Sequence, residues 1–76
     1  MNDKQTAIAI GRLATQYRTL LREAEKFSEQ ASTLAIDDRL ADALHLTDSA
    51  IDNLHAARGA LADAVTMQIL SEKGQT

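Results

Sequence analysis

Residues 10–34 read IGRLATQYRTLLREAEKFSEQASTL, and this stretch decides the fold. Apolar residues recur in it with alternating steps of three and four positions. This spacing matches the turn of an α-helix and gathers the residues on one face, which a strand could not do. The stretch therefore predicts one long helix with a buried face. The residues on that face, the first-helix stripe, are Ile10, Leu13, Tyr17, Leu20, Ala24, Phe27, Ala31 and Leu34.

The second half of the chain repeats the pattern with two polar members. We expect this second-helix stripe to be the buried face of a second heptad-patterned helix. Its members are Leu40, Leu44, Thr47, Ile51, Leu54, Arg58, Leu61 and Val65. An alanine column, with one alanine every seven residues, runs beside it. The column either lets two helix backbones approach closely or reflects only the high helix propensity of alanine. It consists of Ala43, Ala50, Ala57 and Ala64.

The break between the two patterns carries no proline or glycine. Ser32 and Thr33 disfavour a helix interior, and Asp37 is a good N-cap for a following helix. We predict a first helix at about 4–32, a turn at about 33–36 and a second helix at about 37–72. The fold class is then all-α, a single antiparallel helical hairpin over 1–76. Gly59 leaves open a split into three helices, because glycine costs about 1 kcal/mol inside a helix.

A two-helix hairpin buries one seam and has a thin core. Further apolar residues lie off the stripes and near the open end of the hairpin, where they would form an exposed patch. Such patches mark self-association or a partner surface. We therefore predict a homodimer that forms a four-helix bundle, with a larger protein partner on the same patch as the alternative. The residues of this open-end patch are Ile8, Met67, Ile69 and Leu70.

Composition excludes several functions. The 76 residues contain no cysteine, so disulfides and thiolate chemistry are absent. No apolar run is long enough to span a bilayer, and we expect a cytoplasmic protein without a membrane partner. The net charge of −3 argues against general affinity for nucleic acid. No nucleophile elbow or phosphate loop occurs, and we expect neither an enzyme nor a cofactor.

One cluster contains metal-ligand residue types. His45, Asp48, Asp52 and His55 follow steps of three, four and three residues and share one helical strip. Imidazole and carboxylate groups can bind Zn²⁺. A single helix presents its ligands along a line, however, so a closed tetrahedral site needs a second helix. We expect a solvated face and no metal site.

The second half of the chain is acidic. Asp42, Asp48, Asp52 and Asp63 lie off the second-helix stripe, although aspartate is a poor residue for a helix interior. The sequence thus predicts a non-enzymatic protein-protein interaction module. By analogy of class, this is a bacterial or phage-type regulator or inhibitor that binds a larger protein through its acidic face or its open-end patch. A secretion-type chaperone or adaptor is an alternative.

The first half also carries a basic ridge, because Arg18, Arg22 and Lys26 recur every four residues. With this ridge and the opening segment TAIAIGR at 6–12, the chain resembles the plasmid RNA-binding regulators of the Rop type. The resemblance implies a dimeric hairpin that binds RNA. It does not extend to the RNA-contacting Asn, Phe and Gln of that family, whose places are taken here by Ala9, Leu13 and Tyr17. RNA binding is therefore the alternative, and nucleic acid is not the partner that we predict.

Overall fold

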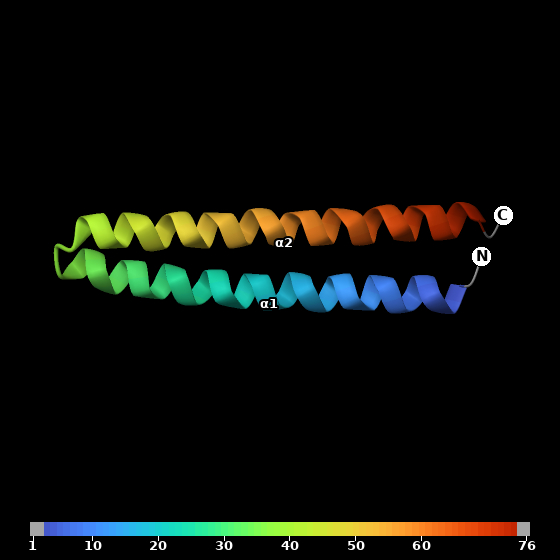
Figure 1. Ribbon diagram of the computed structural model, residues 1–76, viewed down its shortest axis with the longest axis horizontal. Helices are drawn as coiled ribbons and strands as arrows, with labels where there is room; N and C mark the ends of the chain where they lie inside the picture. The colour runs from blue at the N-terminus through green and yellow to red at the C-terminus, as the bar shows by residue number, and fades with distance from the viewer. Residues whose placement is uncertain (1–2, 75–76) are drawn as a thin grey trace.

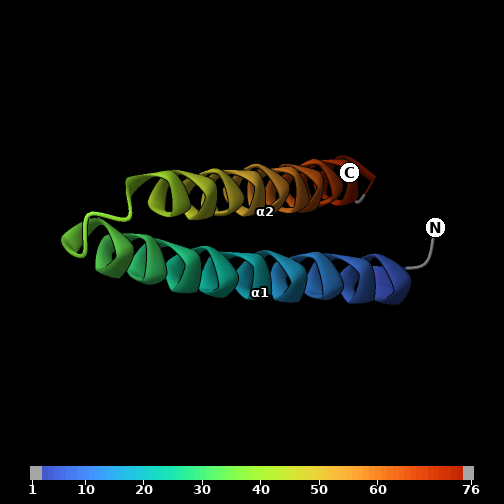
Figure 2. The same ribbon diagram turned by 60° about the vertical axis from the view of Figure 1, so that its left-hand side comes forward.

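The computed structural model describes residues 3–74, which form two α-helices. Helix α1 is Asp3–Ile36 and helix α2 is Leu40–Gly74. They lie side by side and antiparallel in both ribbon views, with the turn at one end and both chain ends at the other (Figures 1 and 2). The hairpin is a rod of 58 × 14 × 11 Å. The predicted all-α helical hairpin is confirmed.

The first helix is longer than predicted. It continues through Ser32 and Thr33 and ends at Ile36, so the expected turn at 33–36 is helical. The Thr33 hydroxyl donates a hydrogen bond to the backbone carbonyl of Glu29, 3.2 Å away. A hydroxyl that bonds back to the preceding turn is compatible with a helix interior, which explains why Thr33 does not end the helix.

The turn comprises residues 37–39 and closes α1. Asp38 has a φ of 59°, in the left-handed region. The backbone N–H of Arg39 donates to the Leu34 carbonyl at 2.9 Å, and that of Asp38 donates to the Ala35 carbonyl at 3.1 Å. These are the two bonds of a Schellman motif, in which Asp38 takes the place usually held by glycine. The prediction that Asp37 caps the second helix is wrong, because both aspartates belong to the end of α1.

Helix α2 begins after Arg39 and runs unbroken to Gly74. The Ala43 N–H donates to the Arg39 carbonyl at 3.0 Å, and the Arg39 guanidinium pairs with the carboxylate of Asp42 in the first turn. Gly59 lies within the helix, so the three-helix alternative is wrong. The cost of one interior glycine is small compared with the backbone bonds of a helix of 35 residues.

The first-helix stripe faces α2. Its alanines, Ala24 and Ala31, are buried, and its other six members are half-buried. The large side chains of α1 therefore fill the space between the two helices.

The buried face of α2 differs from the prediction. All members of the second-helix stripe are exposed, and the alanine column is buried in their place. Half-buried residues continue the same face, among them Leu46, Asn53 and Met67. The buried residues of α2 are Ala43, Ala50, Ala57, Ala60 and Ala64.

The reason lies in the pairing of side-chain sizes. The Asn53 side chain donates to Glu23, so residues equally far from Asp38 lie at about the same level in the rod. This register places Phe27 near the level of Ala50 and Leu20 near that of Ala57. Because α1 supplies bulky side chains, α2 turns small ones toward them, and the helices approach closely.

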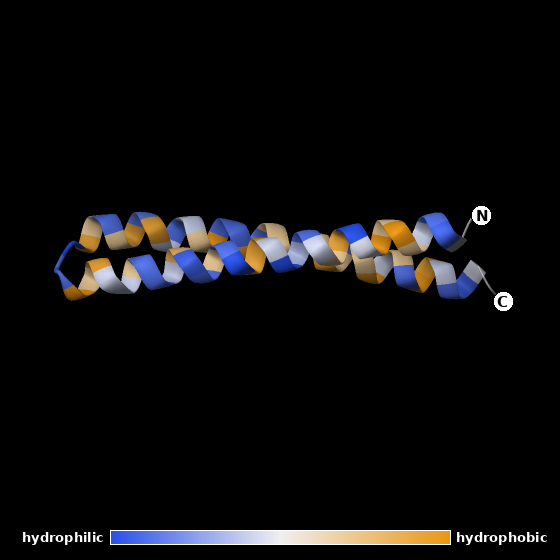
Figure 3. Ribbon diagram, turned by 90° about the horizontal axis from the view of Figure 1, so that it is seen from below, coloured by the Kyte–Doolittle hydropathy of each residue, from blue (hydrophilic) through white to orange (hydrophobic). Residues whose placement is uncertain are grey.

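The hairpin has no core of large residues. Every buried hydrophobic residue in the described chain is an alanine, and no large side chain there is completely buried. Hydrophobic segments recur along both helices from the turn to the open end (Figure 3). Most of the large apolar surface of α2 therefore lies outside the seam between the helices.

Candidate interaction surface

The second-helix stripe is an exposed apolar surface that extends over most of α2. Each of its members from Leu44 to Val65 follows a residue of the buried face by one position, which rotates it by about 100° around the helix axis. The stripe thus lies beside the seam with α1 and not opposite to it. Its six apolar side chains are between 42% and 65% exposed; they are Leu40, Leu44, Ile51, Leu54, Leu61 and Val65.

Two shallow depressions follow the stripe near its middle. One lies between the helices, where Leu54 of α2 meets residues of α1. The other lies on α2 alone and is lined by Ile51, Leu54, His55 and Arg58. The surface is therefore a ridge with a groove beside it. The α1 residues in the first depression are Leu21, Ala24, Glu25, Ser28 and Glu29.

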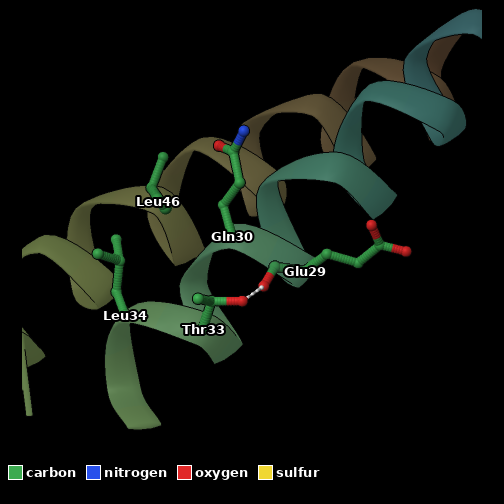
Figure 4. Close-up of a pocket in the computed structure, with 5 residues that line it drawn as sticks. All are labelled: Glu29, Gln30, Thr33, Leu34 and Leu46. Carbon is green, nitrogen blue, oxygen red and sulfur yellow. Dashed lines mark hydrogen bonds between the residues drawn. The ribbon is translucent and has the colours of Figure 1, made fainter. Parts of the chain in front are cut away.

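A third depression lies near the turn and has Leu46 as its α2 side (Figure 4). Glu29, Gln30, Thr33 and Leu34 line it from α1. Its hydroxyl, on Thr33, is already bonded to the backbone of Glu29. The lining thus combines a carboxylate, an amide and a hydroxyl of α1 with two leucines.

The predicted acidic residues are all exposed on α2 but do not form one cluster. From Asp42 to Asp63 they span about 30 Å of helix, given a rise of 1.5 Å per residue. Asp42 pairs with Arg39. Asp48, Asp52 and Asp63 form no ion pair with any residue of the described chain.

The predicted open-end patch is smaller than expected. Ile8, Ile69 and Leu70 are exposed by 47%, 47% and 57%. Met67 is half-buried on the face of α2 that meets α1. Ile69 and Leu70 are consecutive residues, so they point about 100° apart. Three exposed side chains at this end form a weaker surface than the second-helix stripe.

The strip of His45, Asp48, Asp52 and His55 is exposed along α2. Within the described residues, no group of three or more histidines, cysteines or carboxylates is placed to hold a metal ion. The strip offers ligands from one helix only, and α1 lies on another side of α2.

The basic ridge of Arg18, Arg22 and Lys26 is exposed on α1 and makes no ion pair within the part of the chain that the structure describes. The two larger residues at the Rop-type contact positions, Leu13 and Tyr17, are half-buried against α2. Because these side chains pack against α2, they are poorly placed to contact RNA.

The hydrophobic pattern of the sequence places the second-helix stripe in the seam, so the pattern alone does not indicate that this stripe is an exposed surface. The alanine column is the sequence feature that indicates which face of α2 is buried against α1. Its seven-residue repeat has the same period as the stripe, and the bulky residues of the first helix require small residues opposite them.

No protein-family model matches the chain, and no curated protein or solved structure shows significant similarity to it. Neither helix has, within the described residues, a segment that is apolar and long enough to cross a membrane.

Proposed function

We propose that the protein is a non-enzymatic protein-protein interaction module and that the second-helix stripe is its contact surface. One observation carries the proposal. Only alanines are buried in the core of the hairpin, whereas the large apolar side chains of the second-helix stripe are exposed to water. Contiguous apolar surface of this kind marks binding sites in soluble proteins.

The dimensions of the stripe suit a helical partner. From Leu40 to Val65 it extends over about 37 Å at 1.5 Å per residue. Its alternating steps of three and four residues are those with which helices pack in coiled coils and bundles. Burying apolar surface yields roughly 25 cal/mol per Å². A partner helix along the stripe therefore adds the layer of large side chains that the hairpin lacks.

A module of this kind acts by covering an apolar surface of a second protein chain, which can be another protein or a copy of itself. Regulators, inhibitors and secretion-type chaperones or adaptors all work in this way, and the proposal covers these classes. The described surface supports binding over catalysis, because its depressions are shallow and its titratable groups are dispersed along the rod.

The test uses two neighbouring positions on α2. Leu61 is in the stripe and Ala62 is an exposed residue outside it. The immobilised chain is used to capture proteins from a lysate of the organism that encodes it, and bound proteins are identified by mass spectrometry. We expect Leu61→Asp to abolish the capture of a specific protein and Ala62→Asp to retain it. Equal capture by both variants would refute the stripe as the contact surface.

The acidic face is the second candidate surface, because Asp48, Asp52 and Asp63 are exposed without ion-pair partners in the described chain. Exposed charge pairs are screened over about 8 Å at physiological ionic strength. Capture through this face would be lost at high salt and on replacing Asp42, Asp48 and Asp52 together by Asn. Enrichment of RNA in the eluate would instead favour the Rop-type alternative.

A further inference from the structure

We infer that the second-helix stripe is covered by the same stripe of a second copy of this chain, which completes a four-helix bundle. The inference rests on the proposed function, because it takes the stripe as the contact surface. It adds the identity of the occupant. Surface area, shape and charge each support it.

The exposed area of the single hairpin exceeds that of a compact protein. The hairpin exposes 5776 Å². A compact monomer of 8.2 kDa would expose about 4,500 Å² on the usual scaling of area with mass. A compact particle of twice the mass would expose about 7,500 Å², so pairing two hairpins can remove up to about 4,000 Å² in total. Obligate dimers bury 2,000–5,000 Å². The area that pairing can remove from solvent is therefore about the area that one stable dimer interface buries.

The shape of the face favours a copy of itself. The stripe is a ridge, and the depression beside Leu54 has the small residues Ala24 and Ser28 in its α1 wall. Related by a two-fold axis, each copy presents a ridge of the same length and spacing to the other. Ridges that interdigitate at a shared spacing are the basis of helix packing.

The charges of the face are also complementary between copies. Arg58 is the one cation in the stripe, and it lines one depression together with Leu54. Glu25 and Glu29 line the neighbouring depression from α1. In an interface between identical faces, the arginine of each copy approaches the carboxylates of the other. Such pairs set specificity and disfavour a wrong partner.

The first measurement is the mass of the unmodified chain by sedimentation equilibrium at micromolar concentration. We expect about 16.4 kDa, twice the 8.2 kDa of one chain. We also expect a melting temperature that rises with protein concentration, as dimer dissociation requires. A mass of one chain with a sharp, concentration-independent transition would overturn the inference. In that case the capture experiment still tests the proposed function separately.

The second measurement locates the interface. Leu61→Asp should give the mass of one chain or an unfolded chain, whereas Ala62→Asp should remain a folded dimer. A dimer that survives Leu61→Asp would place the interface elsewhere and refute the inference. Because a substituted chain can lose its fold for other reasons, a third experiment restores the interaction.

The third experiment exchanges charges between two variants. Arg58→Glu in one and Glu25→Arg with Glu29→Arg in the other should each weaken self-association at least tenfold. Mixed in equal amounts, the two variants should form a heterodimer, because each now carries the charges that the other lacks. Absence of a heterodimer would refute the contact between Arg58 and these carboxylates across the interface. A size tag on one variant distinguishes the mixed dimer by native mass spectrometry.

Discussion

The side-chain amide of Asn53 in α2 donates a hydrogen bond to a carboxylate oxygen of Glu23 in α1, at 3.1 Å. Asn53 is half-buried on the face of α2 that carries the buried alanines, Leu46 and Met67. A polar residue in an apolar seam fixes register, because only one alignment of the helices gives it a partner. This bond joins the two helices somewhat closer to the turn than to the open end.

Replacing Asn53 by alanine should lower the free energy of unfolding by about 0.5–1.5 kcal/mol, the usual net value of one hydrogen bond. Glu23→Gln is the matched control, because the amide oxygen of glutamine also accepts the bond. It should therefore unfold close to the unmodified chain in urea. If Glu23→Gln costs as much as Asn53→Ala, the carboxylate charge matters more than the bond.

Leu20 and Leu54 should respond differently to alanine substitution. Leu20 is half-buried against α2, so Leu20→Ala should cost about 2 kcal/mol at every protein concentration. Leu54 is 45% exposed, so the cost of Leu54→Ala should be small in dilute solution and grow as copies associate. Urea unfolding at two protein concentrations measures both. Equal, concentration-independent costs would mean that the second-helix stripe faces α1 after all.

Gly59→Ala should raise stability by about 1 kcal/mol, the difference in helix propensity between the two residues. Apart from its chain neighbours and the backbone of its own helical turn, a Cβ added at Gly59 meets no heavy atom within 4 Å, so no clash offsets the gain. Gly11, which is equally open, serves as the comparison in α1. Thermal unfolding followed by circular dichroism measures both variants. A loss at Gly59 alone would show that another chain approaches the backbone there.

The turn should tolerate only certain residues at position 38. Asp38 has a positive φ, which glycine adopts freely and a β-branched residue adopts at a cost of about 1–2 kcal/mol. Melting temperatures should therefore rank Asp38→Gly at or above the unmodified chain, and Asp38→Val below it. Asp37→Val, next to it in the turn, is the control and should cost less. The reverse order would contradict the Schellman geometry.

The sequence was sufficient to predict the two helices and the buried face of the first one. The first-helix stripe contains large apolar residues and no second apolar face competes with it, so its periodicity indicates a single buried face. The second helix carries two parallel lines with the same period, one of alanines and one of larger residues. Periodicity alone cannot choose between them, and hydrophobicity favoured the wrong one. The choice depends on the large side chains of Phe27 and Leu20 in α1. It is therefore set by how the two helices pack together and not by the second helix alone.

The turn and the proposed contact surface were harder to predict for physical reasons. Asp37 and Asp38 suit the start of a helix and, less commonly, a left-handed C-terminal residue, and only the backbone distinguishes the two. The proposed contact surface was hidden by the same error that misplaced the seam. Because the alanine column faces α1, the larger side chains of the second-helix stripe must face solvent.

An interior of alanines affects how the chain unfolds. An extended chain of 8.2 kDa exposes about 11,900 Å², and the hairpin still exposes 5776 Å², so folding one copy covers only about half of that surface. The heat capacity change of unfolding and the denaturant m-value both scale with the surface that folding covers. Both should be small for an isolated hairpin, which then melts gradually over a wide temperature range. A partner on the second-helix stripe would enlarge both quantities, so a steep transition whose midpoint rises with protein concentration would reveal an occupied stripe.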